Sequence, residues 1–271
     1  MSNETIGRAR IIPALLLKGQ GLVKGVRFKR HTYVGDPINA VKIFNDKEVD
    51  ELIFLDISAS REGRKVPLSL VEKIADECFM PFAVGGGIRN VNDVRELISA
   101  GAEKVVINTA AIETPELITE ASSIFGSQSI IVSIDVKTTW LGKKRVYSLS
   151  GRKKTSLDPV DWARKAEKLG AGELFVNSID RDGSMSGYDL ELLKALSGAV
   201  NIPVIACGGA GKIEDLSDVI HKGGVAAAAA GSFFVFHGRR RAVLINFPTK
   251  SEIEDICRGK LKPPGKEEEA P

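Results

Sequence analysis

The sequence predicts an α/β protein folded as a single (β/α)8 TIM barrel with a two-fold half-barrel repeat. Short apolar runs alternate with longer amphipathic segments eight times, and part of the pattern recurs 122 residues later. Nearly continuous apolar runs are typical of buried parallel strands, and eight strand–helix units suffice to close a barrel. The length of 271 residues fits one such domain.

The expected strands are 9–17, 51–57, 81–86, 104–108, 129–135, 173–179, 203–207 and 225–231. The expected helices lie between them, at about 37–47, 66–78, 91–100, 114–125, 158–169, 188–199 and 212–222. Start signals for three of these helices are Asn90 and Asn92, Thr114-Pro115, and Asp158-Pro159. After Gly238 we expect an extended segment. The barrel domain should span residues 1–258, followed by a disordered charged tail over 259–271.

The half-barrel repeat is visible as one register that holds across three successive units. The aligned segments are 51–57 with 173–179, 80–94 with 202–216, 107–111 with 229–233 and, at a slightly shorter offset, 11–16 with 130–135. Generic barrel units also resemble each other. The shared register favours two fused half-barrels instead.

Composition excludes several classes of function. The net charge of +3 gives no case for nucleic acid or a membrane surface, and no apolar run is long enough to span a bilayer. The N-terminal residues lack the apolar core of a signal peptide, so we expect a cytoplasmic protein. Cys78, Cys207 and Cys257 have no CxxC spacing and the three histidines form no HExxH pattern, so neither a metal nor another cofactor is expected.

Two glycine clusters follow expected strands at the carboxyl ends, where barrel sites lie. Glycine there lets backbone N–H groups approach an anion, helped by the next helix N-terminus. Turns also need glycine, but two equivalent clusters across one mouth indicate a ligand with a phosphate at each end. The predicted phosphate-binding residues are Gly86, Gly87, Asn108, Thr109, Asp182, Gly183, Gly208, Gly209, Ala230, Gly231 and Ser232.

Carboxylates stand near three expected strand ends on this face: Asp56, Asp135, and the pair Asp180 and Asp182. Asp135 ends a fully apolar strand, where a carboxylate can exchange protons with a bound ligand, so it is the candidate catalytic residue. For Asp56, a loop cap or a salt bridge with a nearby base is an open alternative.

Charged residues open four of the expected strands at the opposite, N-terminal face, namely Arg10, Glu51, Lys104 and Glu173. If these side chains point inward, they form a ring of two acids and two bases. Charges at strand starts also commonly point outward, so the residue pattern alone leaves both arrangements open.

Together these features resemble HisF, the cyclase subunit of imidazole glycerol phosphate synthase, over roughly residues 8–238. The matching stretches are RIIP, VKG, GDP, DELIFLDI, VGGGI, AEKVVINTAA, FGSQS, SIDVK, GAGE, SIDRDGSMSGYD and ACGGAGK. The related isomerase HisA shares the half-barrel plan but fits less well, since SIDRDG with GYD is similar to HisF.

The resemblance implies that a HisH-like glutaminase docks on the N-terminal face and that ammonia crosses the barrel to a ligand held by its phosphates. A separate glutaminase is expected because no Cys-His arrangement of a glutaminase triad is recognisable in the chain. Lys24 is assigned to a mobile first loop over the site, with Asp56 as a further substrate contact. The implied ammonia gate is Arg10, Glu51, Lys104 and Glu173.

One position departs from the family pattern. The family reaction needs two aspartates on opposite strands as general acid and base, and Asp135 is one of them. The stretch that carries the other usually reads close to CLDVKDG, whereas this chain reads ALLLKGQG, so Leu16 holds the catalytic position and Gly19 replaces a second acid. The internal repeat independently places Leu16 opposite Asp135. Losing such a group commonly costs roughly 10²–10⁴-fold in rate. Asn177 also stands where a threonine is usual.

Three functions stay open. The first is the cyclase (a lyase) of histidine biosynthesis, which uses ribulosyl aminoimidazole carboxamide ribotide and ammonia, with Asp135 alone or with Asp56 or Asp182 substituting. The second, which we favour, is an ammonia-conducting subunit for amidation of a surface-polysaccharide sugar, with a sugar amidotransferase as a further partner. LLLK, YVGDP, ECFMP and AAGSFFVFHG followed by RRAVL are similar to that WbuZ-type branch of HisF-like proteins. The third is a non-catalytic phosphate-binding scaffold.

Overall fold

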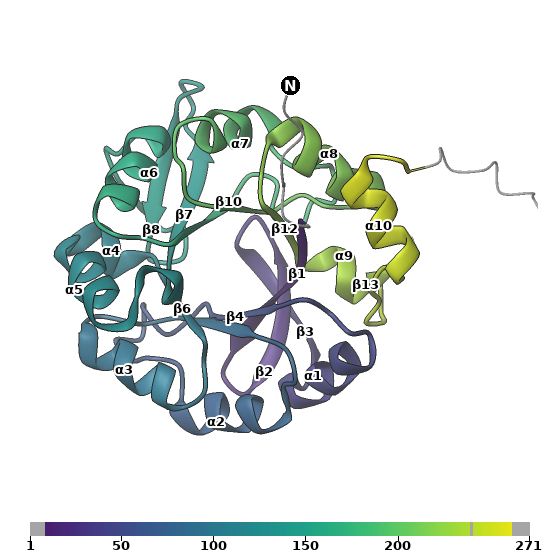
Figure 1. The fold of residues 1–271 in the computed structure, drawn as a ribbon, viewed down its shortest axis with the longest axis horizontal. Helices are drawn as coiled ribbons and strands as arrows, with labels where there is room; N and C mark the ends of the chain where they lie inside the picture. Colours follow the sequence, from purple (N-terminus) through teal and green to yellow (C-terminus); the bar gives the residue numbers. More distant parts are fainter. Residues whose placement is uncertain (1–8, 239–240, 262–271) are drawn as a thin grey trace, which may run out of the picture.

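A closed barrel of parallel strands forms the centre of the molecule, with helices around it (Figure 1). The computed structural model describes residues 9–238 and 241–261. Its barrel strands are β1 (Arg10–Lys18), β4 (Leu52–Asp56), β5 (Phe82–Gly85), β6 (Lys104–Ile107), β7 (Ile130–Thr138), β10 (Glu173–Ser178), β11 (Val204–Cys207) and β12 (Ala227–Ala230). Pairing of β7 with β10 closes the barrel. The predicted (β/α)8 architecture is confirmed.

The covering helices follow the strands, and all except the short α4 and α9, which were not expected, lie at or close to the expected residues. They are α1 (Pro37–Asp46), α2 (Leu68–Glu77), α3 (Val91–Ser99), α4 (Thr109–Glu113), α5 (Glu116–Phe125), α6 (Pro159–Lys168), α7 (Leu190–Ser197), α8 (Ile213–Gly223) and α9 (Ser232–Val235). Asn90 begins α3 by accepting from the Asp93 backbone N–H at 3.0 Å, and Asp158 begins α6 in the same way. The expected Thr114-Pro115 pair precedes α5 without a side-chain cap.

Apolar side chains pack in two regions because successive residues of a strand point to opposite faces. On β10, Leu174 and Val176 point outward and pack under the helices. Glu173, Phe175 and Asn177 alternate with them and point into the barrel. One strand therefore supplies a charge at the bottom of the barrel, a fully buried ring in the middle and an amide at the top.

The two halves of the barrel repeat the same order of elements. In each half a first strand, β1 or β7, is followed by an antiparallel hairpin, and the fourth strand, β6 or β12, leads into a short helix. The hairpins are β2 (Gly21–Val26) with β3 (Lys29–Gly35), and β8 (Lys144–Ser148) with β9 (Lys153–Lys154). Neither was expected, because strands rich in basic and small residues lack a clear apolar alternation.

The chain after β12 is extended where we expected it and helical where we did not. β13 (Phe236–His237) pairs with β14 (Ala242–Val243), and α10 (Lys250–Arg258) follows. Of the tail predicted for 259–271, residues 262–271 lie outside the described residues.

Helix α10 has clear local causes. Thr249 and Glu252 form a reciprocal capping box at its start, and Gly259 ends it in the left-handed conformation, with φ of 64°. Its buried Ile256 faces α8, where the Ser217 hydroxyl donates to the Ile256 carbonyl oxygen at 3.3 Å. The TKSE sequence was a usable signal for this helix.

Candidate functional site

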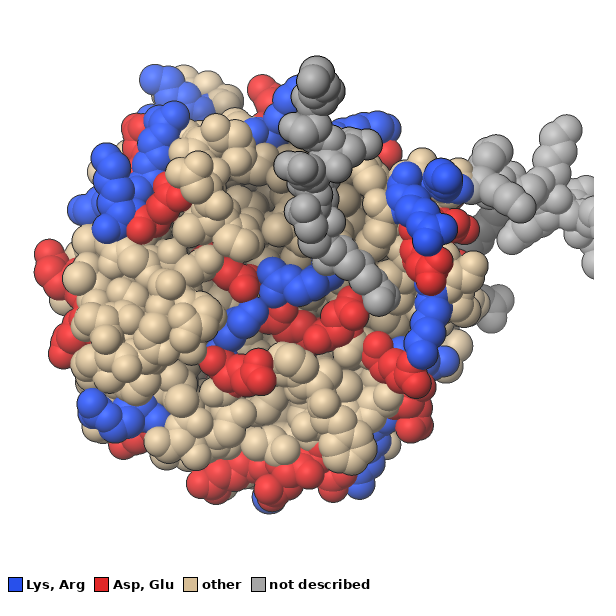
Figure 2. Space-filling view, in the orientation of Figure 1, with Lys and Arg blue, Asp and Glu red and all other residues tan. Residues whose placement is uncertain are grey.

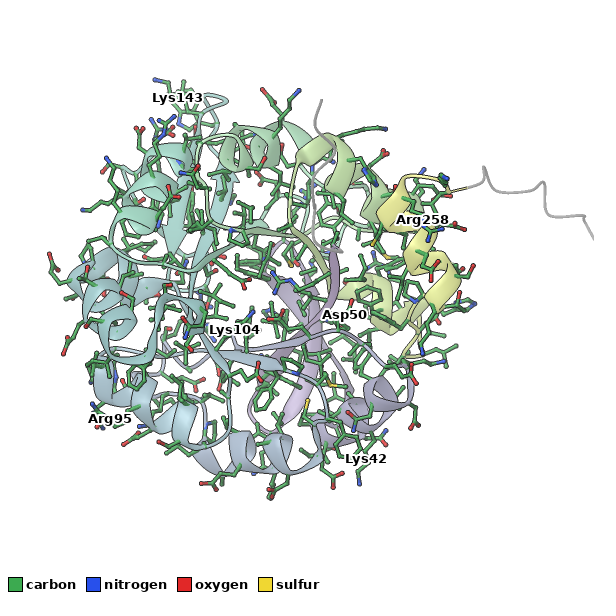
Figure 3. All side chains as sticks on the ribbon, viewed as in Figure 1. Lys42, Asp50, Arg95, Lys104, Lys143 and Arg258 are labelled. Carbon is green, nitrogen blue, oxygen red and sulfur yellow. The ribbon has the colours of Figure 1, made fainter. Side chains whose placement is uncertain are left out.

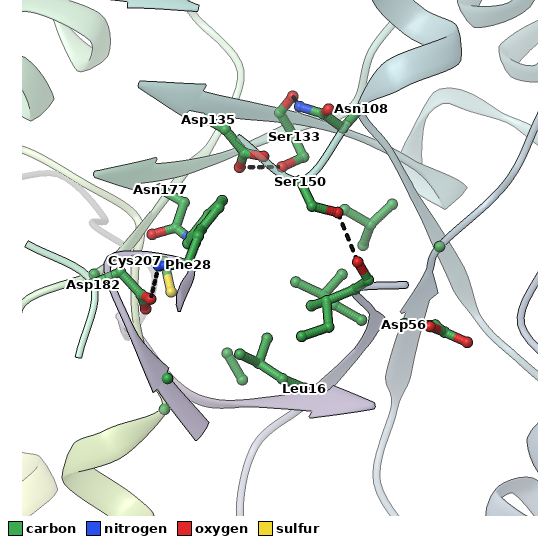
Figure 4. A pocket seen from close by; sticks show the side chains of 18 of the residues that line it. Leu16, Phe28, Asp56, Asn108, Ser133, Asp135, Ser150, Asn177, Asp182 and Cys207 are labelled. Atoms are coloured by element: carbon green, nitrogen blue, oxygen red, sulfur yellow. Dashed lines mark hydrogen bonds between the residues drawn. The ribbon is translucent and has the colours of Figure 1, made fainter. Parts of the chain in front are cut away.

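A cavity of about 400 Å³ opens at the carboxyl ends of the barrel strands (Figure 4). This volume falls within the range of small-molecule sites. The cavity brings together every residue that the sequence placed at a ligand site, namely Leu16, Lys24, Asp56, Gly86, Gly87, Asn108, Thr109, Asp135, Asp182, Gly183, Gly208, Gly209, Ala230, Gly231 and Ser232.

Asp135 on β7 and Leu16 on β1 lie on opposite sides of the cavity (Figure 4). Asp135 is buried and accepts a hydrogen bond from the Ser133 hydroxyl at 3.4 Å. Burial raises the pKa of Asp135 to about 7; the Asp182 charge adds to the rise and the Ser133 hydrogen bond opposes it. A carboxyl that titrates near neutrality can give or take a proton at physiological pH, whereas leucine cannot.

Asp182 is a second buried acid of this cavity. Its Oδ2 accepts from the Phe28 backbone N–H at 3.3 Å, and Phe28 lies in the turn of the β2–β3 hairpin. Burial raises the pKa of Asp182, while the Phe28 N–H and the Lys24 charge oppose the rise. Asp182 thus holds the hairpin over the cavity. Asp180 does not line the cavity. Its Oδ2 instead accepts a hydrogen bond from the Thr138 backbone N–H, at the end of β7, at 2.7 Å.

Asp56 has the structural role that sequence reasoning left open. Its carboxylate accepts from the Ser58 and Ala59 backbone N–H groups at 3.0 and 3.1 Å and pairs with Arg64 at 2.6 Å. In Figure 4 its side chain points away from the centre of the cavity. Asp56 lines the site but caps a loop, so it is not placed to substitute for the missing acid.

Lys24 belongs to an ordered strand, β2, rather than to an open loop. Its Nζ is buried and donates to the Ala14 carbonyl oxygen at 2.5 Å. Burial lowers the pKa of Lys24 to about 8, against the opposing effects of Asp182 and Cys207. A Cβ atom at Gly231 would collide with this Nζ, so glycine at 231 makes room for the amine beside the turn after β12.

The backbone packing explains two of the turn glycines without a ligand. Gly87 and Gly209 have φ of 72° and 122°. A Cβ atom would collide with the Arg64 carbonyl oxygen at Gly87 and with the Gly187 carbonyl oxygen at Gly209. Their identity is therefore a requirement of the fold. What supports a ligand role is that both turns border one cavity.

The β8–β9 turn passes over part of the cavity and was missed by sequence reasoning. Thr109 Oγ1 accepts from the Leu149 backbone N–H at 3.1 Å, and the Ser150 hydroxyl donates to the Ile57 carbonyl oxygen at 2.8 Å (Figure 4). The turn is thereby tied to both β6 and β4. Asn108 contributes by donating to the Ser133 carbonyl oxygen at 3.0 Å.

Strand periodicity could have predicted two further residues that line the cavity, Ser133 and Cys207. Ser133 precedes Asp135 by two positions, so both side chains share a face. Cys207 pairs in register with Asn177 on the neighbouring strand, and burial raises the pKa of its thiol to about 12. The thiol therefore stays protonated near neutral pH.

The four charged residues at the opposite end of the barrel point inward and form a closed ring. Arg10 pairs with Glu51 at 2.5 Å and with Glu173 at 2.9 Å, and Lys104 pairs with the same two acids at 3.2 and 2.8 Å. Figure 2 shows acidic and basic side chains gathered at the centre of the barrel, and Figure 3 places Lys104 there.

The ring is electrically balanced and partly shielded from water. Glu51 and Glu173 are buried. Burial would lower the pKa of Arg10, but the hydrogen bonds and charges of the two glutamates raise it, so Arg10 stays charged. Two acids and two bases in a closed circuit leave a net charge of zero at the bottom of the barrel.

The described part of the chain holds neither a candidate metal site nor a candidate membrane span. Across residues 9–238 and 241–261, no cluster of three or more His, Cys, Asp or Glu side chains is arranged to hold a metal ion. Within the same ranges, no helix has the length and apolar character that crossing a membrane requires.

Fold and site define a (β/α)8-barrel protein with a ligand cavity at one end and an ion-pair ring at the other. Residues 10–240 match the histidine biosynthesis protein family. The chain is 50% identical over 247 residues to a Pseudomonas aeruginosa protein provisionally named imidazole glycerol phosphate synthase subunit hisF2, covering 91% of this chain and 98% of the relative. It is 50% identical over 225 residues to imidazole glycerol phosphate synthase subunit HisF of Pyrococcus furiosus, covering 83% and 89%. The chain belongs to the HisF family.

Proposed function

We propose that this chain is the synthase subunit of a glutamine amidotransferase. It receives ammonia from a HisH-like glutaminase docked on the N-terminal face and passes it through the barrel to a phosphorylated acceptor in the cavity. The relatives named as imidazole glycerol phosphate synthase subunits support this role. So does the arrangement of an ion-pair ring and a ligand cavity at opposite ends of one barrel.

The ring is suited to control ammonia entry. Ammonia is uncharged, so the ion pairs of the ring bind it only weakly. It can therefore pass when a single ion pair opens. An ammonium ion would have to leave water and enter an apolar interior, which is strongly unfavourable. Below the cavity the interior is lined by apolar side chains such as Phe175 and Ile53, which favour the neutral molecule.

For the acceptor, we propose amidation of a surface-polysaccharide sugar in place of imidazole ring closure. The observation that carries this proposal is Leu16, which faces Asp135 where the cyclase reaction needs a second proton-transfer group. The alternative acids do not take that place: Asp56 is paired with Arg64, and Asp182 holds the Phe28 backbone. Ammonia delivery survives such a change, because it depends on the other end of the barrel.

The cyclase of histidine biosynthesis is the second candidate. It is favoured by the names of the relatives and by the raised pKa of Asp135, which suits a single residue to act in turn as acid and base. Kinetics with the cyclase substrate separate the two. The amidation proposal expects poor turnover of ribulosyl aminoimidazole carboxamide ribotide even with free ammonia, and robust turnover would refute it.

The ammonia route is tested at the ring. Lys104→Ala and Glu51→Ala should reduce the product formed per glutamine hydrolysed in the complex with the glutaminase, while activity with ammonium salt is kept. Lys222→Ala, which removes an exposed ion pair with Asp218 on α8, is the matched control and should leave coupling unchanged. Intact coupling in both ring variants would show that the ring is only structural.

A further inference from the structure

Several basic side chains that line the cavity have no hydrogen-bonding or ion-pair partner among residues 9–238 and 241–261. Lys18 ends β1, Arg61 lies in the loop after β4 and Arg152 lies on the β8–β9 turn, and all three line the cavity. None of the three has a side-chain hydrogen bond or ion pair with any residue in the described ranges. Gathering cations without counter-charges is electrostatically costly, so the arrangement indicates an anionic ligand.

Two of these cations share one side of the mouth with His31 of β3. Burial lowers the pKa of His31, and the charges of Lys18 and Arg61 lower it further. The three side chains line the same cavity, and the charges of Lys18 and Arg61 both act on His31. Because His31 is thereby biased toward its neutral form, it can donate or accept a hydrogen bond without adding to the repulsion.

Arg61 and Arg152 belong to segments that contact the turn after β5 and the start of α4. Arg61 directly follows Ser60, whose hydroxyl accepts from the Gly87 backbone N–H at 3.2 Å. Arg152 lies on the turn that Thr109 holds through Leu149. The segments that carry Arg61 and Arg152 are therefore tied to the turn at Gly87 and to the start of α4 at Thr109, and both arginines line the same cavity.

The other turn is different. Gly231, after β12, lies against Lys24, whose Nζ already donates to the Ala14 carbonyl oxygen. Lys29 and Arg30 of the β2–β3 hairpin also line the cavity, so basic side chains reach it from this hairpin as well.

We propose that the Gly87–Thr109 side of the cavity, extended by Lys18, Arg61 and Arg152, is a subsite for a diphosphate. The planar guanidinium fork matches phosphate oxygens in pairs, and two such forks with a lysine balance more charge than one phosphate group carries. The acceptor is then a sugar carried on a diphosphate. This last step rests on the proposed amidation function, whereas the subsite itself does not.

Calorimetric titration of the purified full chain tests the subsite, with inorganic pyrophosphate and inorganic phosphate compared at equal ionic strength. Pyrophosphate should bind at least about tenfold more tightly than phosphate, the effect of one added charge-assisted contact. The Arg61→Gln plus Arg152→Gln double variant should lose that preference. Lys143→Gln removes an exposed cation at the outer edge of the molecule (Figure 3) and should keep it.

Equal affinity for the two anions, or a loss in the double variant that matches the loss in Lys143→Gln, would overturn the subsite. A second titration with uridine diphosphate identifies the source of the diphosphate. Binding tighter than pyrophosphate supports a nucleotide carrier, and equal binding supports a diphosphate held without a base. Because the readout is binding by this chain alone, failure here is distinguishable from failure of glutamine coupling at the ring.

Discussion

Leu16 on β1 and Asp135 on β7 occupy equivalent positions in the two half-barrels and face each other across one cavity (Figure 4). The pair is chemically unequal, since one side chain can transfer protons and the other cannot. Most of the surrounding site keeps the two-fold plan, including the turns at Gly87 and Gly209. The asymmetry at this pair therefore bears on the reaction rather than on the fold.

Leu16→Asp should create the missing acid. We expect turnover of ribulosyl aminoimidazole carboxamide ribotide with ammonium salt to rise, by up to roughly 10²–10⁴-fold if no other group is lacking. Steady-state rates measure this. Leu16→Asn is the control, because it has nearly the same shape as aspartate but cannot transfer a proton. Equal rates for the two variants would show that a second acid is not what limits cyclase chemistry.

Asp135→Asn should change how stability depends on pH. Because the pKa of Asp135 rises from 3.8 to about 7 on folding, the folded protein holds a proton there that the unfolded chain has released. Through this group, wild-type stability falls as pH rises through that interval and is level above it. The variant should gain on the wild type by up to a few kcal/mol across the interval. Urea unfolding at several pH values measures the difference, and a difference independent of pH would contradict the prediction.

Phe175→Ala should destabilise the barrel. The ring is fully buried in the interior, so its removal leaves a cavity between the ion-pair ring and the ligand site. The expected loss in the free energy of unfolding is about 3–5 kcal/mol. Phe79→Ala, at a side chain that is 86% exposed, is the control and should change stability little. Similar unfolding midpoints for the two variants would mean that the interior closes around the gap.

Thr249→Ala should weaken the attachment of α10. The variant loses both hydrogen bonds between the threonine hydroxyl and Glu252. We expect a loss of about 1 kcal/mol, seen as a lower thermal midpoint. Ser251→Ala, in the exposed first turn of the same helix, should behave like the wild type. A midpoint shared by all three proteins would show that α10 adds nothing to global stability.

Sequence patterns predicted the barrel because its strands and helices have strong local periodicity. The same strand order predicted at which end of the barrel the cavity lies. For α10 the signal was the local capping box of Thr249 and Glu252, which is not a periodic pattern. Periodicity also failed for the two hairpins, because their positions depend on contacts with distant segments, such as that of Ser150 with Ile57. Such pairings leave no periodic trace in the sequence.

Residue identities by themselves predicted the barrel, its repeat, the pairing of Leu16 with Asp135 and the residues that line the cavity, because these follow from strand order and alternation. Only the tertiary structure decided three matters: that the four charged side chains at the bottom of the barrel turn inward, that Asp56 forms an ion pair with Arg64, and that Lys18, Arg61 and Arg152 line one cavity. The physical reason is that side-chain direction and pairing depend on which strands and loops become neighbours when the barrel closes.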